Sequence, residues 1–295
     1  MTPFATDVSQ ATRARDGAGS QASRNLRLLW RSVGYEFRKR IQFRTGFVVR
    51  EMMNGAVEPI IMLFVYAALY RSAGAEGTGS LRGWSFDEIL KYVAGLLVVR
   101  KLVFHNRALD VSTEIFEGRI TKYLVMPFRF FVLVQGRFIQ YTLLQVVLAG
   151  LVWGIGYGIL GDRWLVPVSA AATVQAMLLV GLGSYCCFLL YFIIHSLAFW
   201  LDVVWSLLVM AWFFIAFTGG SSMPVSQMPA GLARVFEYGF PYWTISAPIE
   251  VMMGRLGPGD VARGTGILVG WLISLEVLRR FVWRRGLAKY VGAGM

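Results

Sequence analysis

The chain alternates between long apolar runs and short charged stretches, and the apolar runs have the length of membrane spans. A helix needs about 20 apolar residues to cross the hydrocarbon core of a bilayer. The candidate runs cover residues 47–70, 86–105, 132–160, 167–199, 201–219 and 261–283. This pattern predicts an all-α integral membrane protein with six transmembrane helices.

A different pattern precedes the first run. From Leu26 to Ile41 apolar residues recur at intervals of three or four, and arginines lie largely away from that stripe. This arrangement predicts a basic amphipathic helix over residues 24–44, lying in the membrane interface beside anionic lipid. The alternative is a solvated helix packed on a soluble core, but the adjoining sequence offers no such core.

The residues around Ser85 predict where the second span begins. In "GWSFDEIL", Ser85 can cap the helix, and Glu88, three positions later, can reach back to the cap. Trp84 and Ile89 stand at the two positions of a hydrophobic staple. We expect the helix to start here, at the outer surface.

The charge distribution predicts the orientation. With the amino terminus inside, eighteen lysines and arginines fall on inner segments and six on outer loops. Basic residues favour the cytoplasmic side, so both termini are expected in the cytoplasm. Residues 1–23 are predicted to be a flexible cytoplasmic tail without the apolar core of a secretory signal. Residues 24–290 are predicted to form the membrane domain, and residues 291–295 a second cytoplasmic tail.

Composition agrees with this class and excludes others. The 295 residues are 56% hydrophobic and only 16% charged, well below the roughly 25% typical of soluble domains. The net charge of +12 is explained by residues flanking the spans, so no nucleic-acid partner is expected. The two cysteines, Cys186 and Cys187, are adjacent within an apolar run and are interpreted as structural.

No catalytic chemistry is visible. The sequence contains no GxxxxGK[ST] phosphate-binding loop, so ATP hydrolysis by this chain alone is not expected. The two histidines, His105 and His195, are far apart, and neither a metal-ligand cluster nor a catalytic triad can be identified. We therefore expect neither an enzyme nor a bound metal.

Charges within the spans are candidates for a transport pathway. Glu58 lies well inside an apolar run, where it could contact substrate or pair with Arg50 or another span. Arg100, Lys101 and His105 cluster at the inner end of the second run. Arg100 and Lys101 could extend to lipid phosphates, which is the favoured interpretation, or contact substrate.

A charged segment, "DVSTEIFEGRITKYLVMPFRFF", separates the second and third runs on the expected cytoplasmic side. Its apolar residues share one face of a helix, and its charged residues are expected to face water or a partner. Pro127 would end this helix. The apolar face consists of Phe116, Ile120, Tyr123 and Leu124, and the charged face of Glu114, Glu117, Arg119 and Lys122.

A second unusual segment, "GGSSMPVSQMPAGLARVFEYGFPYW", lies between the fifth and sixth runs. It is too rich in proline for a plain loop and too apolar to be fully solvated. We expect a short amphipathic segment that dips into the outer leaflet. Breaks are expected at Pro224, Pro229 and Pro241, with Phe240, Tyr242 and Trp243 at the interface.

Taken together, these parts resemble the permease subunits of ABC-2 type exporters. The stretches "GWSFDEILKY", "EIFEGRITKYLVMPFRFF" and "WRRGLAKYVGAG" are similar to those of the ABC-2 family formerly filed as an uncharacterised domain family. The resemblance covers about Leu26 to Gly294. It implies an ABC-2 exporter fold, with residues 24–290 as the permease domain.

The resemblance also implies partners. The charged segment would be a coupling helix that meets a separately encoded ABC ATPase dimer through Glu114, Glu117, Gly118, Arg119 and Lys122, while Phe116, Ile120 and Leu124 hold it against the permease. ATP and Mg²⁺ would bind to that ATPase, and no cofactor to this chain. A second permease chain, identical or different, would complete the pathway in the bacterial inner membrane. The cargo is expected to be hydrophobic or amphipathic.

The main alternative to an exporter permease is an ion-driven secondary transporter that uses Glu58. A lipid-modifying membrane enzyme and an importer permease are further alternatives.

Overall fold

The computed structural model describes residues 57–72, 80–104, 110–124, 130–161, 164 and 167–290. The helix predicted over residues 24–44 and the two predicted tails lie outside these residues. The elements, in chain order, are α3 (Val57–Ser72), β1 (Ser80–Leu81), β2 (Trp84–Ser85), α4 (Phe86–Val103), α5 (Val111–Phe116), α6 (Thr121–Leu124), α7 (Phe130–Leu160), α8 (Ala170–Ser196), η3 (Leu197–Phe199), α9 (Trp205–Thr218), η4 (Val225–Gln227), α10 (Ala230–Glu237), α11 (Phe240–Thr244), α12 (Ser246–Met252) and α13 (Pro258–Lys289).

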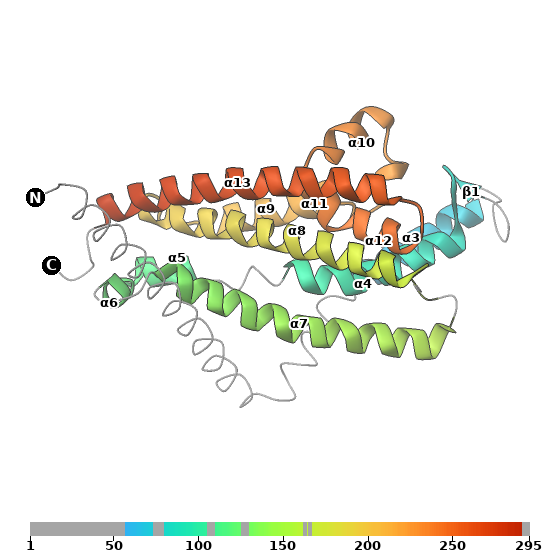
Figure 1. The fold of residues 1–295 in the computed structure, drawn as a ribbon, viewed down its shortest axis with the longest axis horizontal. Helices are drawn as coiled ribbons and strands as arrows, with labels where there is room; N and C mark the ends of the chain where they lie inside the picture. The colour runs from blue at the N-terminus through green and yellow to red at the C-terminus, as the bar shows by residue number, and fades with distance from the viewer. Residues whose placement is uncertain are drawn as a thin grey trace, which may run out of the picture.

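The long helices α7, α8 and α13 run along the longest axis of the molecule (Figure 1). Helix α8 packs against α13 and α12, and α4 packs against α7. The short helices α5 and α6 lie at one end of this bundle, which we call the α5–α6 end. Strands β1 and β2 lie at the other, which we call the hairpin end.

Three helical segments in the described part of the chain are long and apolar enough to cross a membrane: Phe130–Leu160, Ala170–Phe199 and Pro258–Lys289. They coincide with the third, fourth and sixth predicted spans. The shorter apolar helix Ile60–Ser72 overlaps the first predicted span, and Trp205–Thr218 falls within the fifth. Helix α4 covers most of the second predicted span and carries charged residues at both ends. A total of six spans therefore stays a prediction.

The start of α4 confirms the predicted cap. The backbone N–H of Ser85 donates to Glu88 Oε2 over 2.8 Å, and the backbone N–H of Glu88 donates to Ser85 Oγ over 3.3 Å. Just before it, β1 and β2 form an antiparallel hairpin whose two loop residues, Arg82 and Gly83, both have positive φ angles, 50° and 78°. This backbone matches the tight hairpin turn that favours glycine and asparagine.

Helix α8 lies at the centre of the core. Cys186, Cys187, Phe188 and Phe192 on α8 are buried, and the two cysteines are free, as their structural interpretation requires. The ring of Phe192 also contacts Trp283 of α13, with 5.3 Å between ring centroids. This aromatic packing joins α8 to α13 near the α5–α6 end.

Helix α11 fits between α8 and α13 because both helices present a glycine to it. A Cβ atom on Gly183 of α8 would lie 2.1 Å from Thr244 Oγ1, and one on Gly264 of α13 would lie 2.1 Å from the ring of Trp243. The predicted breaks are found, since Pro224 and Pro229 precede η4 and α10 and Pro241 lies in the first turn of α11.

The structure does not support the expectation that the aromatic residues of this segment face the membrane interface. Phe240, Tyr242 and Trp243 are buried in the protein rather than at its surface. The glycine contacts explain this burial, because they let α11 pack closely against α8 and α13 in the core. The exposed apolar residues of the segment instead belong to α10 and its end, at Leu232, Val235 and Tyr238.

Candidate functional site

The charged segment after α4 consists of two short helices, not one continuous helix. Helix α5 ends at Phe116, and the chain turns at Gly118, whose φ angle is 69°, before α6 begins at Thr121. The backbone N–H of Ile120 donates to the carbonyl of Glu114 over 3.0 Å and closes this turn. This turn interrupts the helical periodicity. The residues before and after it therefore do not share the buried and exposed faces that a single continuous helix predicts.

Glu114 is the first consequence. It was expected to face water or a partner, but its side chain is only 10% exposed, and its Oε1 lies 2.9 Å from Nη2 of Arg137 on α7. The hydroxyl of Tyr123 lies 3.4 Å from the same oxygen. Glu114 is therefore an internal anchor of the segment rather than part of its outer face.

The apolar face is corrected in the same way. Phe116, expected to hold the segment against the bundle, is exposed, whereas Ile120 is fully buried as expected. Tyr123 packs on the core, and its ring is tilted against that of Phe130 with 5.2 Å between the centroids. Leu124 ends α6, and its side chain lies outside the described part of the chain.

Two further hydrogen bonds connect the segment to other long helices. Ser112 Oγ lies 2.9 Å from Nδ1 of His195, which is buried at the end of α8. Thr121 Oγ1 lies 3.2 Å from the hydroxyl of Tyr290, just beyond α13. With the Glu114–Arg137 pair, these bonds attach α5 and α6 to α7, α8 and the end of α13.

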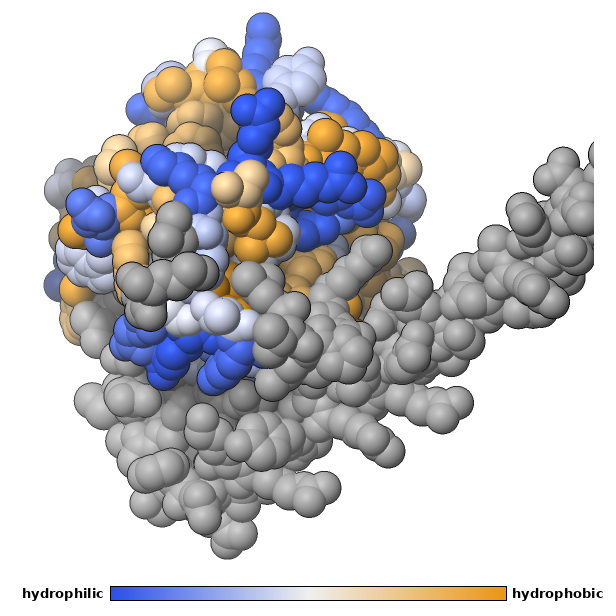
Figure 2. Space-filling view, turned by 90° about the vertical axis from the view of Figure 1, so that its left-hand side faces the viewer, coloured by the Kyte–Doolittle hydropathy of each residue, from blue (hydrophilic) through white to orange (hydrophobic). Residues whose placement is uncertain are grey.

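The other side of the segment is polar and accessible. Glu117, Arg119 and Lys122 are exposed and Gly118 is half-buried, as expected for a surface open to a partner. Glu117 and Arg119 form an ion pair, and both side chains are 51% exposed. Figure 2 looks onto this end of the molecule and shows hydrophilic side chains gathered there.

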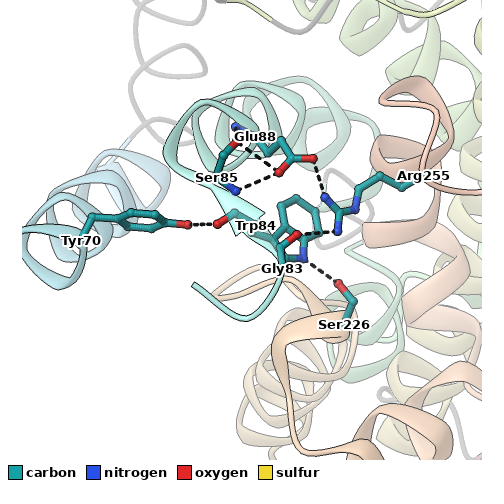
Figure 3. Close-up of polar contacts among 7 residues, drawn as sticks. All are labelled: Tyr70, Gly83, Trp84, Ser85, Glu88, Ser226 and Arg255. Carbon is teal, nitrogen blue, oxygen red and sulfur yellow. Dashed lines mark hydrogen bonds and ion pairs between the residues drawn. The ribbon is translucent and has the colours of Figure 1, made fainter. Parts of the chain in front are cut away.

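A second polar cluster lies at the hairpin end, centred on Arg255 between α12 and α13 (Figure 3). Arg255 Nη1 lies 2.6 Å from Glu88 Oε1, and its Nη2 donates to the carbonyl of Gly83 over 3.1 Å. Its guanidinium also lies over the ring of Trp84, 4.0 Å from the centroid. We call Gly83, Trp84, Glu88 and Arg255 the Arg255 clasp.

Buried polar side chains lie beside this clasp. Tyr66 donates to Gln227 Oε1 over 2.6 Å, and Trp84 Nε1 donates to Ser226 Oγ over 3.2 Å. Glu250 of α12 is buried, and the hydroxyl of Tyr242 donates to its Oε2 over 3.3 Å. Burial raises the pKa of Glu250 to about 7, against the opposing effects of the Tyr242 hydrogen bond and of Arg255.

The structure does not support the favoured interpretation of Arg100 and Lys101. Their side chains were expected to extend to lipid phosphates, but both residues are buried by the protein, and the Arg100 guanidinium lies 5.3 Å from the centroid of the Phe104 ring. Their contact with substrate stays a hypothesis. The backbone of Glu58 lies in α3, its side chain is outside the described part of the chain, and so is all of His105.

The partners in both clusters are not among the residues predicted from the sequence. Arg137 is a cation inside the predicted third span, and this signal was available because isolated charges in spans are usually paired. Glu250 carried the same signal, since it follows a short apolar run. Arg255 carried none, because an arginine in an outer loop is ordinary in a membrane protein.

The arrangement defines a multi-pass helical membrane protein with polar clusters at the two ends of its bundle. No metal-binding group of three or more His, Cys, Asp or Glu occurs within the described ranges. The model of a protein family described as "ABC-2 family transporter protein" matches residues 56–294 of this chain. This chain therefore belongs to the ABC-2 family of transporter proteins, whose membrane subunits generally work with an ABC ATPase. No curated protein matches the chain. The family does not favour the ion-driven alternative.

Proposed function

We propose that this chain is the permease subunit of an ABC-2 type exporter, powered by an ATPase dimer encoded separately. It spans the bacterial inner membrane six times with both termini in the cytoplasm, and a second permease chain completes the pathway. The cargo is hydrophobic or amphipathic and leaves the cytoplasm or the inner leaflet. ATP and Mg²⁺ bind to the ATPase.

The observation that carries this proposal is the two-sided attachment of α5 and α6. Glu117, Arg119 and Lys122 are exposed on one side and offer charges to a protein partner. On the other side the Glu114–Arg137 pair fixes the segment to α7. A partner that displaces the exposed side must therefore also move the helices bonded to the buried side, which is what coupling to ATP hydrolysis requires.

Co-purification tests the proposal. The chain is expressed with its neighbouring genes, and the ATPase activity that purifies with it is measured. We expect an ATPase to purify with the parent chain and to be lost when Glu117→Arg and Arg119→Glu are combined. Both residues are exposed, so the double variant keeps the fold.

The hairpin end provides a matched control. Glu237 and Arg263 form another exposed ion pair, 3.7 Å long, and Glu237→Arg with Arg263→Glu is the same kind of reversal. We expect this variant to retain the ATPase. A parent chain that purifies without ATPase activity, or equal retention in both double variants, would refute the proposed docking side.

A further inference from the structure

Arg255 joins parts of the chain that are remote in sequence, because its side chain contacts three residues of one unit. Glu88, Gly83 and Trp84 lie within residues 80–88, the hairpin with the first turn of α4, which we call the hairpin unit. Glu88 uses its second carboxylate oxygen to accept from the backbone of Ser85. The cap of α4 and the link to the α12–α13 loop therefore share one carboxylate (Figure 3).

The hairpin unit also covers η4. Arg82 Nη1 donates to the carbonyl of Gln227 over 2.5 Å, and Trp84 Nε1 donates to Ser226. Arg82 has a φ angle of 50° in the left-handed region, which is unfavourable for a residue with a side chain. A glycine would relax this turn, but only a long donor such as arginine provides the contact with Gln227.

The surface beneath the hairpin unit is polar. Gln227 is 5% exposed, and its Oε1 accepts from Tyr66 of α3. Within the described ranges, its Nε2 has no hydrogen-bond partner in the protein.

We propose that Arg255 holds the hairpin end closed, and that its release from Glu88 and Trp84 lets the hairpin unit lift from η4 and admits water to Gln227. This inference rests on the proposed exporter function, because such a protein must open at its outer end. Arg255 is a positioning residue in this scheme and need not touch the cargo.

The partial exposure of the ion pair makes its separation reversible. The Arg255 and Glu88 side chains are 29% and 36% exposed, so water can replace each partner as the ion pair separates. The Trp84 side chain is 1% exposed, and its packing in the core defines a single closed position of the hairpin unit. A seam made only of packed apolar side chains would offer no such exchange.

The test measures access to Gln227 in the full chain reconstituted in lipid. Gln227→Cys is labelled with a membrane-impermeant maleimide, and the unsubstituted chain, whose two cysteines are buried, gives the background. We expect Arg255→Ala to raise the labelling rate by about tenfold, which corresponds to about 1.4 kcal/mol. Adding Glu88→Gln to Arg255→Ala should raise it no further, because both changes break the same contact.

Two controls isolate the clasp. Arg263→Ala removes an arginine that pairs with Glu237 and, among the residues that the structure describes, has no polar contact with the hairpin unit, so it should leave labelling at the parent rate. Ser222→Cys is exposed near η4 and should react equally fast in every background. Equal labelling of Gln227→Cys with Arg255→Ala and with Arg263→Ala would overturn the proposal.

A second variant covers the case in which Arg255→Ala does not fold. Arg255→Lys keeps the charge but loses the two-pronged contact and the planar stacking, so an intermediate rate is expected. A parent-like rate for Arg255→Lys would then overturn the proposal.

These measurements use the permease without an ATPase, so their failure is separate from a failure of co-purification. With a partner ATPase present, trapping by MgATP and vanadate should raise labelling of Gln227→Cys. If trapping has no effect while Arg255→Ala does, Arg255 is a static brace and the opening step is wrong.

Discussion

The two ends of the bundle use the same chemistry in opposite settings. At the α5–α6 end Arg137 and Glu114 form an ion pair of 2.9 Å with side chains that are 28% and 10% exposed. At the hairpin end Arg255 and Glu88 form one of 2.6 Å, but Glu88 is 36% exposed. The burial of the carboxylate, not the length of the contact, separates them.

This difference determines which ion pair can separate at a low cost in free energy. A buried carboxylate that loses its partner cannot be hydrated, whereas an exposed one exchanges the partner for water. The Glu114–Arg137 pair is therefore suited to transmit a displacement without separating. The Arg255 clasp is suited to open and close.

The largest expected effect comes from Arg137→Ala, which leaves Glu114 buried without its cation. We expect a loss of about 3–5 kcal/mol of stability, the usual cost of breaking one side of a buried pair. Thermal unfolding in detergent measures it. Glu117→Gln is the control for breaking an exposed ion pair of the same segment. Glu117 lies three positions after Glu114 but is exposed, so its substitution should change stability by less than about 0.5 kcal/mol. Equal effects of the two substitutions would contradict the distinction between the ends.

Glu250 extends the comparison to pH. Burial raises its folded-state pKa from 4.5 to about 7, so the folded protein binds a proton that the unfolded chain releases between these values. Stability from this group is present below pH 4.5 and is lost as pH rises through 7, by about 3–4 kcal/mol in total at roughly 1.4 kcal/mol per pH unit.

Unfolding midpoints at pH 5 and pH 8 test this expectation. The unfolding midpoint of Glu250→Gln should fall less between pH 5 and pH 8 than that of the parent chain, since glutamine cannot ionise. The difference between the two slopes isolates Glu250 from other carboxylates. If the variant keeps the parent slope, Glu250 is not the group that titrates.

A smaller effect is expected where α11 enters the core. A Cβ on Gly264 would meet the Trp243 ring, while one on Gly266 would meet nothing within 4 Å. Gly264→Ala should therefore cost about 1–3 kcal/mol through overpacking. Gly266→Ala, on the same helix, should gain up to about 1 kcal/mol because alanine favours the helix. If Gly264→Ala and Gly266→Ala change stability in the same direction and by the same amount, the close packing of α11 against Gly264 is contradicted.

Sequence reasoning succeeded where the determinants are local. The Ser85–Glu88 cap depends on residues three positions apart, and the three long apolar helices depend on continuous composition. The family match to residues 56–294 likewise confirms the resemblance based on short stretches in a fixed order. None of these features requires knowledge of which helices are neighbours.

It failed where side chains choose distant partners or where the helical phase changes. Phe116, Ile120 and Leu124 share a face only if one helix continues through Gly118, whose positive φ angle instead turns the chain. Glu114 and Arg137 are 23 positions apart, and Glu88 and Arg255 are 167 apart. Periodicity carries no information on such pairs.

The smallest expected effect on stability completes the comparison. Arg255→Ala removes an exposed ion pair and a cation–π contact, for which we expect a loss of about 1 kcal/mol. Unfolding midpoints of Arg255→Ala and Arg137→Ala, measured in the same detergent, compare the two ends directly. Because the hairpin end then opens without unfolding, a small loss of stability should accompany the large rise in Gln227 labelling. A loss as large as that of Arg137→Ala would instead mean that Arg255 supports the fold, and the hairpin end would not differ from the α5–α6 end.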